Sequence, residues 1–232
     1  MTMIGPTPAE MMPVSSFMRR ILRELLASQV QCLIVIRNEV DSLQLPELRT
    51  ARMVLRLPRE SDRPEFVRVY QRSWSLYEPW VPQPPAGQTF DQMFDHTLAR
   101  SDGGFKDGTG YRFFGFLPNG VLATRVNLFH IVRDAAQRAV ISWQVNAELS
   151  NQGYTSEAVR ALLDFAFAPQ PYGLALHRVQ ADVIPQNAAS IRVAEKAGFR
   201  REGYAKAYLK IAGKWQDHII FAKLSEEHLE RA

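Results

Sequence analysis

Cysteine is almost absent from this sequence: its 232 residues contain only Cys32. A single cysteine excludes an intramolecular disulfide and fits a reducing compartment, so we expect a cytoplasmic protein. Metal-ligand patterns are lacking as well. The five histidines are scattered, without a carboxylate partner at ligand spacing, and no zinc-type spacing occurs. The sequence therefore predicts no metal site.

Membrane-spanning runs and nucleic-acid-binding patterns are also lacking. The apolar run 32–36 is far shorter than the about 20 residues that a bilayer span needs. The net charge is only +4, and no basic run has interleaved aromatic residues. A solvated basic surface explains this charge better than an acidic partner such as RNA. We expect neither a membrane span nor direct nucleic-acid binding.

The remaining composition, with 46% hydrophobic residues, is ordinary for one sizeable core. We interpret residues 48–232 as one domain and residues 1–47 as an N-terminal extension. Residues 1–13 are rich in proline, threonine and methionine, which predicts poor order. Residues 14–27 carry apolar side chains on one helical face, which favours a helix packed on the domain or on a partner subunit. A signal peptide and a translation start further downstream remain alternatives.

The most informative segment is the polar loop 150–157. It follows an apolar run, residues 139–145, that is typical of a strand, and it precedes a run with apolar residues at helical spacing. The first N–H groups of a helix have no internal acceptor, so a loop of this kind can bind a phosphate. Gly153 lets the backbone approach a ligand closely. Taken alone, the loop is better explained as a plain strand-to-helix turn.

A second unit of the same kind follows about forty residues later. Residues 178–184 predict a strand, and a helix follows through residue 197. Asn187 suits the N-cap, and Gly198 suits the left-handed position after the helix. Two consecutive strand–loop–helix units place their helix N-termini at the same edge of a sheet.

The other elements are less distinctive. The residues 61–65, with Pro64, predict a helix start, and the proline-rich residues 78–85 predict a loop. A second helix is predicted over 89–99. Strands are predicted over 111–117 and 121–129, around a turn at 118–120, and two last strands pair around residues 212–213.

Several motifs together resemble the GCN5-related N-acetyltransferases (GNAT), and the RimJ/RimL ribosomal-protein-alanine N-acetyltransferase group in particular. They are residues 48–56 as opening strand, 153–158 as coenzyme A loop, 187–190 with 197–199 as second cofactor segment, and 202–206 with 213–218 as closing strands. The resemblance runs from about residue 48 to residue 224. It implies an α/β (α+β) fold: a mixed, mostly antiparallel sheet of about seven strands with helices on both faces and a splayed central parallel pair.

The resemblance also implies acetyl-CoA as cofactor and assigns its contacts. The cofactor-binding residues implied are Gln144, Val145, Ser150, Asn151, Gln152, Gly153, Tyr154, Thr155, Ser156, Asn187 and Ser190. A strand N–H near Gln144 or Val145 is expected to stabilise the charge of the tetrahedral intermediate. Ser190 is the implied catalytic general acid for the leaving thiolate. Tyr77, Glu78 and Trp80 are the implied acceptor-binding residues, because the corresponding loop covers the acceptor site in the family.

No general base is identified. A related subgroup uses a glutamate at the position of Leu209, and Glu78, His96, Glu148 and Asp217 are the remaining candidates. A neutral α-amine, whose pKa is near 8, needs no strong base.

We expect acetyl transfer to the N-terminal α-amine of a protein, ribosomal or other, by a monomer or homodimer. A small-amine acetyltransferase acting on an aminoglycoside or polyamine is one alternative. A degenerate domain that binds acyl-CoA without catalysis is the other, because Ser150 and Asn151 depart from the usual family loop and no base is identified.

Overall fold

A computed structural model describes residues 45–229 of the chain. The expectations for residues 1–44, including the amphipathic helix over 14–27, lie outside the described residues. The strands are β1 (Glu47–Arg49), β2 (Val54–Arg56), β3 (Tyr111–Phe116), β4 (Leu122–Val132), β5 (Arg138–Val145), β6 (Arg178–Val183), β7 (Arg200–Ile211) and β8 (Lys214–Leu224). The helices are α2 (Arg63–Tyr77), α3 (Phe90–Lys106), α4 (Tyr154–Phe167), α5 (Ala188–Lys196) and α6 (Ser225–Leu229), with short 3-10 turns η1 (Glu60–Asp62), η2 (Glu78–Trp80) and η3 (Ala147–Leu149).

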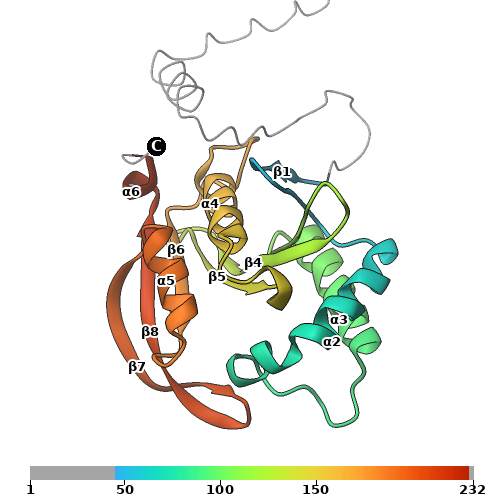
Figure 1. Cartoon of the computed structure of the whole chain (residues 1–232). Helices are drawn as coiled ribbons and strands as arrows, with labels where there is room; N and C mark the ends of the chain where they lie inside the picture. The colour runs from blue at the N-terminus through green and yellow to red at the C-terminus, as the bar shows by residue number, and fades with distance from the viewer. Residues whose placement is uncertain (1–44, 230–232) are drawn as a thin grey trace, which may run out of the picture.

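The strands form one sheet in the order β1-β2-β3-β4-β5-β6-β8-β7 (Figure 1). Neighbouring strands in the described chain are antiparallel except β5 and β6, which are parallel. This confirms the predicted mixed, mostly antiparallel sheet with a central parallel pair. The sheet has eight strands where about seven were predicted, because the single opening strand predicted over 48–56 is wrong: this segment forms two strands. A tight turn, closed by the Thr50 N–H donating to the Met53 carbonyl at 2.9 Å, splits it into β1 and β2.

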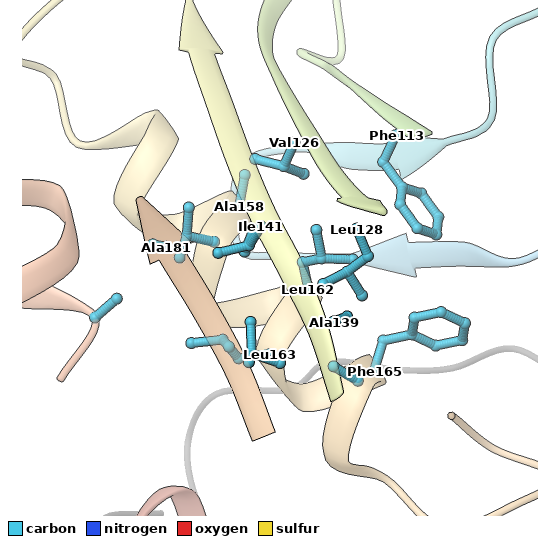
Figure 2. Packing of buried hydrophobic residues seen from close by; sticks show 14 of the residues in the cluster. Phe113, Val126, Leu128, Ala139, Ile141, Ala158, Leu162, Leu163, Phe165 and Ala181 are labelled. Carbon is cyan, nitrogen blue, oxygen red and sulfur yellow. The ribbon is translucent and has the colours of Figure 1, made fainter. Parts of the chain in front are cut away.

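Two apolar clusters place helices on both faces of the sheet. On one face, α4 lays Ala158 and Leu162 against Leu128 and Ile141, and Figure 2 shows these side chains together. On the other face, α2 and α3 pack an aromatic cluster against the sheet. Its fully or largely buried members are Phe66, Val69, Tyr70, Tyr77, Phe94, Phe114 and Leu122. Successive strand residues point to opposite faces, which is why neighbouring phenylalanines of β3 join different clusters.

Most other elements confirm the predictions. Pro64 lies in the first turn of α2, Asn187 caps α5 by accepting the Ser190 N–H at 3.0 Å, and Gly198 has φ +82° after α5. The prediction for α3 is too short, because the helix continues past residue 99 to Lys106. The loop 78–85 begins with the 3-10 turn η2. No helix among the described residues has the length and apolar character to cross a bilayer.

Candidate active site

The parallel pair opens into a gap at the centre of the sheet. β5 and β6 are in register only from Arg138 with Arg178 to Val140 with Gln180, and they diverge beyond these pairs. A cavity of about 220 Å³ lies there. Its lining comes from α2, η2, β5, α4, β6, α5 and β8: Leu76, Tyr77, Trp80, Val81, Ile141, Ser142, Trp143, Gln144, Val145, Thr155, Ala181, Asp182, Val183, Ile184, Asn187, Ala189, Ser190, Val193 and His218.

The edge of β5 offers backbone donors to this gap. The Asn146 N–H donates to the Ala123 carbonyl of β4 at 2.9 Å, and Gln144, two residues earlier, faces β4 in the same way. N–H groups alternate in direction along a strand, so those of Trp143 and Val145 face β6. Of the two expected oxyanion donors, the strand alternation therefore favours Val145 over Gln144.

A hydroxyl from α2 fixes the end of this edge. Tyr77 is buried and its hydroxyl donates to the Val145 carbonyl at 2.7 Å. Burial raises the pKa of Tyr77 to about 12, which keeps the phenol protonated as a donor. Tyr77 also lines the cavity together with Trp80, and their acceptor-binding role stays a prediction. The structure does not bring Glu78 to the cavity wall, because its side chain is exposed on η2.

The side chain of Gln144 has a fixed orientation. Its Oε1 accepts the Tyr70 hydroxyl at 2.7 Å and an Arg125 N–H at 3.0 Å. Two donors to one oxygen assign the amide, so the Nε2 donor lies on the other side. This Nε2 has no partner among residues 45–229, and Gln144 lines the cavity. Arg125 lies among three aromatic rings at 5.3–5.4 Å, and burial lowers its pKa to about 10.

The predicted phosphate loop lies at the N-terminus of α4. Gly153 is the N-cap, with φ +84°, and Asn151 has φ +62°. The first intrahelical bond runs from the Glu157 N–H to the Gly153 carbonyl. Within the described chain, the backbone N–H groups of residues 151–156 have no acceptor. A row of unpaired donors at a helix N-terminus, where the helix dipole is positive, fits a phosphate group.

Arg52 holds this loop in shape, a role that the sequence did not reveal. Its backbone N–H and Nε donate to Glu157 at 3.0 and 2.7 Å, and its Nη1 donates to the Gln152 carbonyl at 3.0 Å. The guanidinium carbon lies 4.1 Å from the centroid of the Tyr154 ring. Burial disfavours ionised Glu157, but hydrogen bonds from Thr50 and Arg52 outweigh it and lower the pKa of Glu157. The two residues lie 105 positions apart, which is why local patterns missed the pair.

The N-terminus of α5 supplies the next polar groups. Asn187 and Ser190 both line the cavity, and the cap bond from the Ser190 N–H to the Asn187 Oδ1 orients both residues. The Ser190 hydroxyl has no hydrogen-bond partner within the described residues, so it is free to donate to a ligand. From the loop 150–156, Thr155 reaches the cavity wall, and the others lie at the helix tip beside it.

The candidate bases named from the sequence do not line the cavity. Glu148 is paired with Arg72 and Arg68, whose hydrogen bonds lower its pKa. Asp217 accepts the Tyr204 hydroxyl and the Ala207 N–H, both at 2.7 Å, and stabilises the β7–β8 hairpin. His96 contacts Gln88 on the exposed side of α3. No cluster of metal-binding side chains occurs among the residues that the structure describes. The acidic and imidazole groups that do line the cavity are Asp182 and His218.

Fold and site together define an acetyltransferase-type domain. The model of the Acetyltransferase (GNAT) domain family matches residues 52–200, and the chain belongs to this family.

Among its relatives, the Probable N-acetyltransferase YjcK of Bacillus subtilis (strain 168) is 43% identical over 102 residues, which are 44% of this chain and 54% of that protein. The chain thus matches about half the length of that relative. The [Ribosomal protein uS5]-alanine N-acetyltransferase of Escherichia coli (strain K12) is 27% identical over 75% of this chain and 89% of its own. The solved structure of Mycobacterium smegmatis RimJ in complex with CoA-disulfide superposes with a TM-score of 0.69 at 26% identity, over 77% of this chain and 87% of that one.

Proposed function

We propose that this chain transfers the acetyl group of acetyl-CoA to the N-terminal α-amine of a protein. The observation that carries the cofactor part is the continuity of two sets of unpaired donors. The N–H groups of residues 151–156 lie at the tip of α4, and the N–H groups of Trp143 and Val145 lie along the adjoining gap. The diphosphate of acetyl-CoA fits the first set of donors, and the amide-bearing arm that follows the diphosphate fits the second.

The chemistry assigns a task to each part of the site. Acetyl-CoA supplies an activated thioester carbonyl. The Val145 N–H stabilises negative charge on the carbonyl oxygen, and the Ser190 hydroxyl donates to the departing sulfur. The cavity wall formed by Tyr77 and Trp80 holds the amine in line, which is the main requirement of a direct attack.

The protein N-terminus is favoured as acceptor by relatives and by charge. The relatives of the RimJ type that match most of this chain are named as ribosomal-protein-alanine acetyltransferases. A polyamine would require several carboxylates, and Asp182 is the one carboxylate among the described residues that line the cavity. We also propose that the catalytic domain comprises residues 48–232, that residues 1–47 form an extension, and that the protein acts in the cytoplasm.

Calorimetric titration with acetyl-CoA, followed by a thiol-release assay, tests the proposal. The acceptors are peptides beginning with alanine, serine or methionine, the same peptides with a blocked N-terminus, and spermidine. We expect turnover on free peptide N-termini and none on blocked ones. Turnover on spermidine alone would support the small-amine alternative. Tight acetyl-CoA binding without turnover on any amine would support the non-catalytic alternative.

A matched variant locates the catalytic hydroxyl. Ser190→Ala removes the donor to sulfur and leaves the cap bond, which uses the backbone N–H. We expect kcat to fall on the order of 100-fold with acetyl-CoA affinity retained, since general acid catalysis typically contributes about 10²–10⁴-fold. An unchanged kcat would exclude Ser190 from the reaction.

A further inference from the structure

Two ionisable side chains of β6 and β8 share the cavity wall. Asp182 is opposite Ile220 in the β6–β8 register, and side chains at alternate strand positions share a face. His218, two residues before Ile220, therefore points to the same face as Asp182. Such diagonal neighbours lie about 7–8 Å apart. Both line the same cavity as Ser190, on the side opposite the α4 core.

The tautomer of His218 follows from its contact. The Nδ1 lies 3.1 Å from the Gln216 carbonyl oxygen, which can only accept, so Nδ1 carries the hydrogen. The Nε2 of the neutral ring then has a free lone pair. Nε2 has no partner within the described chain. Among the described residues, the fully buried side-chain nitrogen and oxygen atoms that lack a hydrogen-bond partner belong to Ser101, Arg125 and Asn127. The Nε2 of the buried His218 ring is not one of them, so this atom is accessible from the cavity that the ring lines.

Asp182 presents a carboxylate oxygen to the same space. Its Oδ1 accepts the Gln180 Nε2 hydrogen at 2.8 Å, and its Oδ2 has no partner among residues 45–229. Burial raises the pKa of this carboxyl, with positive groups acting against the rise. A partly buried carboxylate with one unpaired oxygen attracts a cation.

Apart from Asp182, the groups near His218 do not compete for the proton. The Tyr77 phenol, with its pKa of about 12, stays protonated and bound to β5. The Tyr208 ring contacts the imidazole edge-on, with centroids 5.7 Å apart. The Asp217 oxygens accept the Ala207 N–H and the Tyr204 hydroxyl, and these bonds, with the charge of Lys206, lower the pKa of Asp217. The open base at the cavity is thus the imidazole.

We propose that Asp182 binds the acceptor amine as its ammonium ion and that the Nε2 of His218 accepts the proton that this ion must lose before its nitrogen can attack. A bond forms between the amine nitrogen and the thioester carbonyl carbon, and the carbon–sulfur bond breaks. The first proton passes from Nε2 to water, and the second proton, which the nitrogen loses once it is bonded to the carbonyl carbon, is taken up by the thiolate, so that amide, thiol and one released proton result. This inference rests on the proposed function.

The test uses three variants of the full chain and a peptide that the wild type accepts. In H218Q we expect kcat at saturating peptide to fall on the order of 100-fold. We also expect the pH dependence of kcat to differ between the wild type and H218Q, because the variant lacks the proposed base. D182N is expected to raise the KM of the peptide about tenfold with a smaller effect on kcat. His96→Gln is the matched control, because that exposed histidine lies away from the cavity, and it should match the wild type.

A fourth variant separates catalysis from structure. H218A leaves a space that free imidazole can occupy, and added imidazole should restore activity to H218A and not to D182N. Near-wild-type kcat in H218Q overturns the inference. So does a loss that comes with weakened acetyl-CoA binding and no imidazole rescue, which identifies a structural histidine. If the wild type binds acetyl-CoA but accepts no amine, the proposed function itself fails and the inference with it.

Discussion

Gly153→Ala tests the loop at the tip of α4 most directly. Gly153 has φ +84°, and an added Cβ would lie 3.4 Å from the Arg52 Nη2. Gly120, in the turn between β3 and β4, provides a matched control with φ +83° and nothing within 4 Å of an added Cβ. Both substitutions place an L-residue in the left-handed region, which costs about 1–2 kcal/mol.

The two variants differ in what the strain can displace. Gly120→Ala can only lower the free energy of unfolding, by about 1–2 kcal/mol, or roughly 2–8 °C in Tm for a domain of this size. In Gly153→Ala the loop can relieve the strain by rotating its N–H groups away from the ligand position. Since about 1.4 kcal/mol is tenfold in affinity, we expect the Kd for acetyl-CoA to rise about tenfold.

Calorimetric titration gives the two Kd values, and urea denaturation gives the two unfolding free energies. We expect Gly120→Ala to bind acetyl-CoA as the wild type does. If both variants weaken binding equally, the loop geometry has no special part in binding. If Gly153→Ala keeps the wild-type Kd, the N–H groups at the tip of α4 do not hold the ligand.

Three further predictions concern stability and its dependence on pH. Gly173→Ala should lower the unfolding free energy by about 1–3 kcal/mol, because a Cβ there would lie 2.3 Å from the Phe165 carbonyl oxygen. The control is Gly103→Ala in α3, whose added Cβ meets nothing within 4 Å and should not destabilise the protein. Thermal unfolding compares the two variants. Tyr77→Phe should lower the free energy of unfolding by about 1 kcal/mol, because a hydrogen bond is lost. Since burial raises the pKa of Tyr77 in the folded protein to about 12, this contribution is complete below about pH 10 and is lost as the pH rises through 12. Urea denaturation at several pH values measures it. Glu157→Gln should lower the free energy of unfolding by less than about 1 kcal/mol, since the side chain of its partner Arg52 is 43% exposed. Because the pKa of Glu157 is lowered in the folded protein, this contribution is present at neutral pH and is lost as the pH falls through that folded pKa. A wild-type stability that does not change between neutral and acid pH would contradict this.

Residue preferences in the sequence predicted the helix caps and turns, whose conformation depends on neighbouring residues alone. The cap at Asn187, the left-handed Gly198 and the turn at Gly120 each use a side chain or backbone preference that the sequence states directly. The two strands of the parallel pair were predicted from apolar runs of the right length. The same features locate the cofactor part of the candidate site.

What was missed depends on distant partners. The turn between β1 and β2 is held by Arg52 binding Glu157, and no local pattern reports an ion pair 105 residues apart. The helix α3 continues through glycine residues that usually end a helix, because Phe105 beyond them packs edge-on to Tyr111. His218 was passed over for its neighbour Asp217. Strand parity would have separated them, since adjacent residues of β8 face opposite sides.

The short pairing of β5 with β6 also affects how the apo protein responds to solvent. Each half of the sheet is closed by its own antiparallel neighbours, β4 on one side and β8 on the other, and three residue positions in register join the halves. The amides along the gap should therefore exchange hydrogen with water faster than those inside either half. A molecule lying between the two strands would slow that exchange and make the halves unfold together.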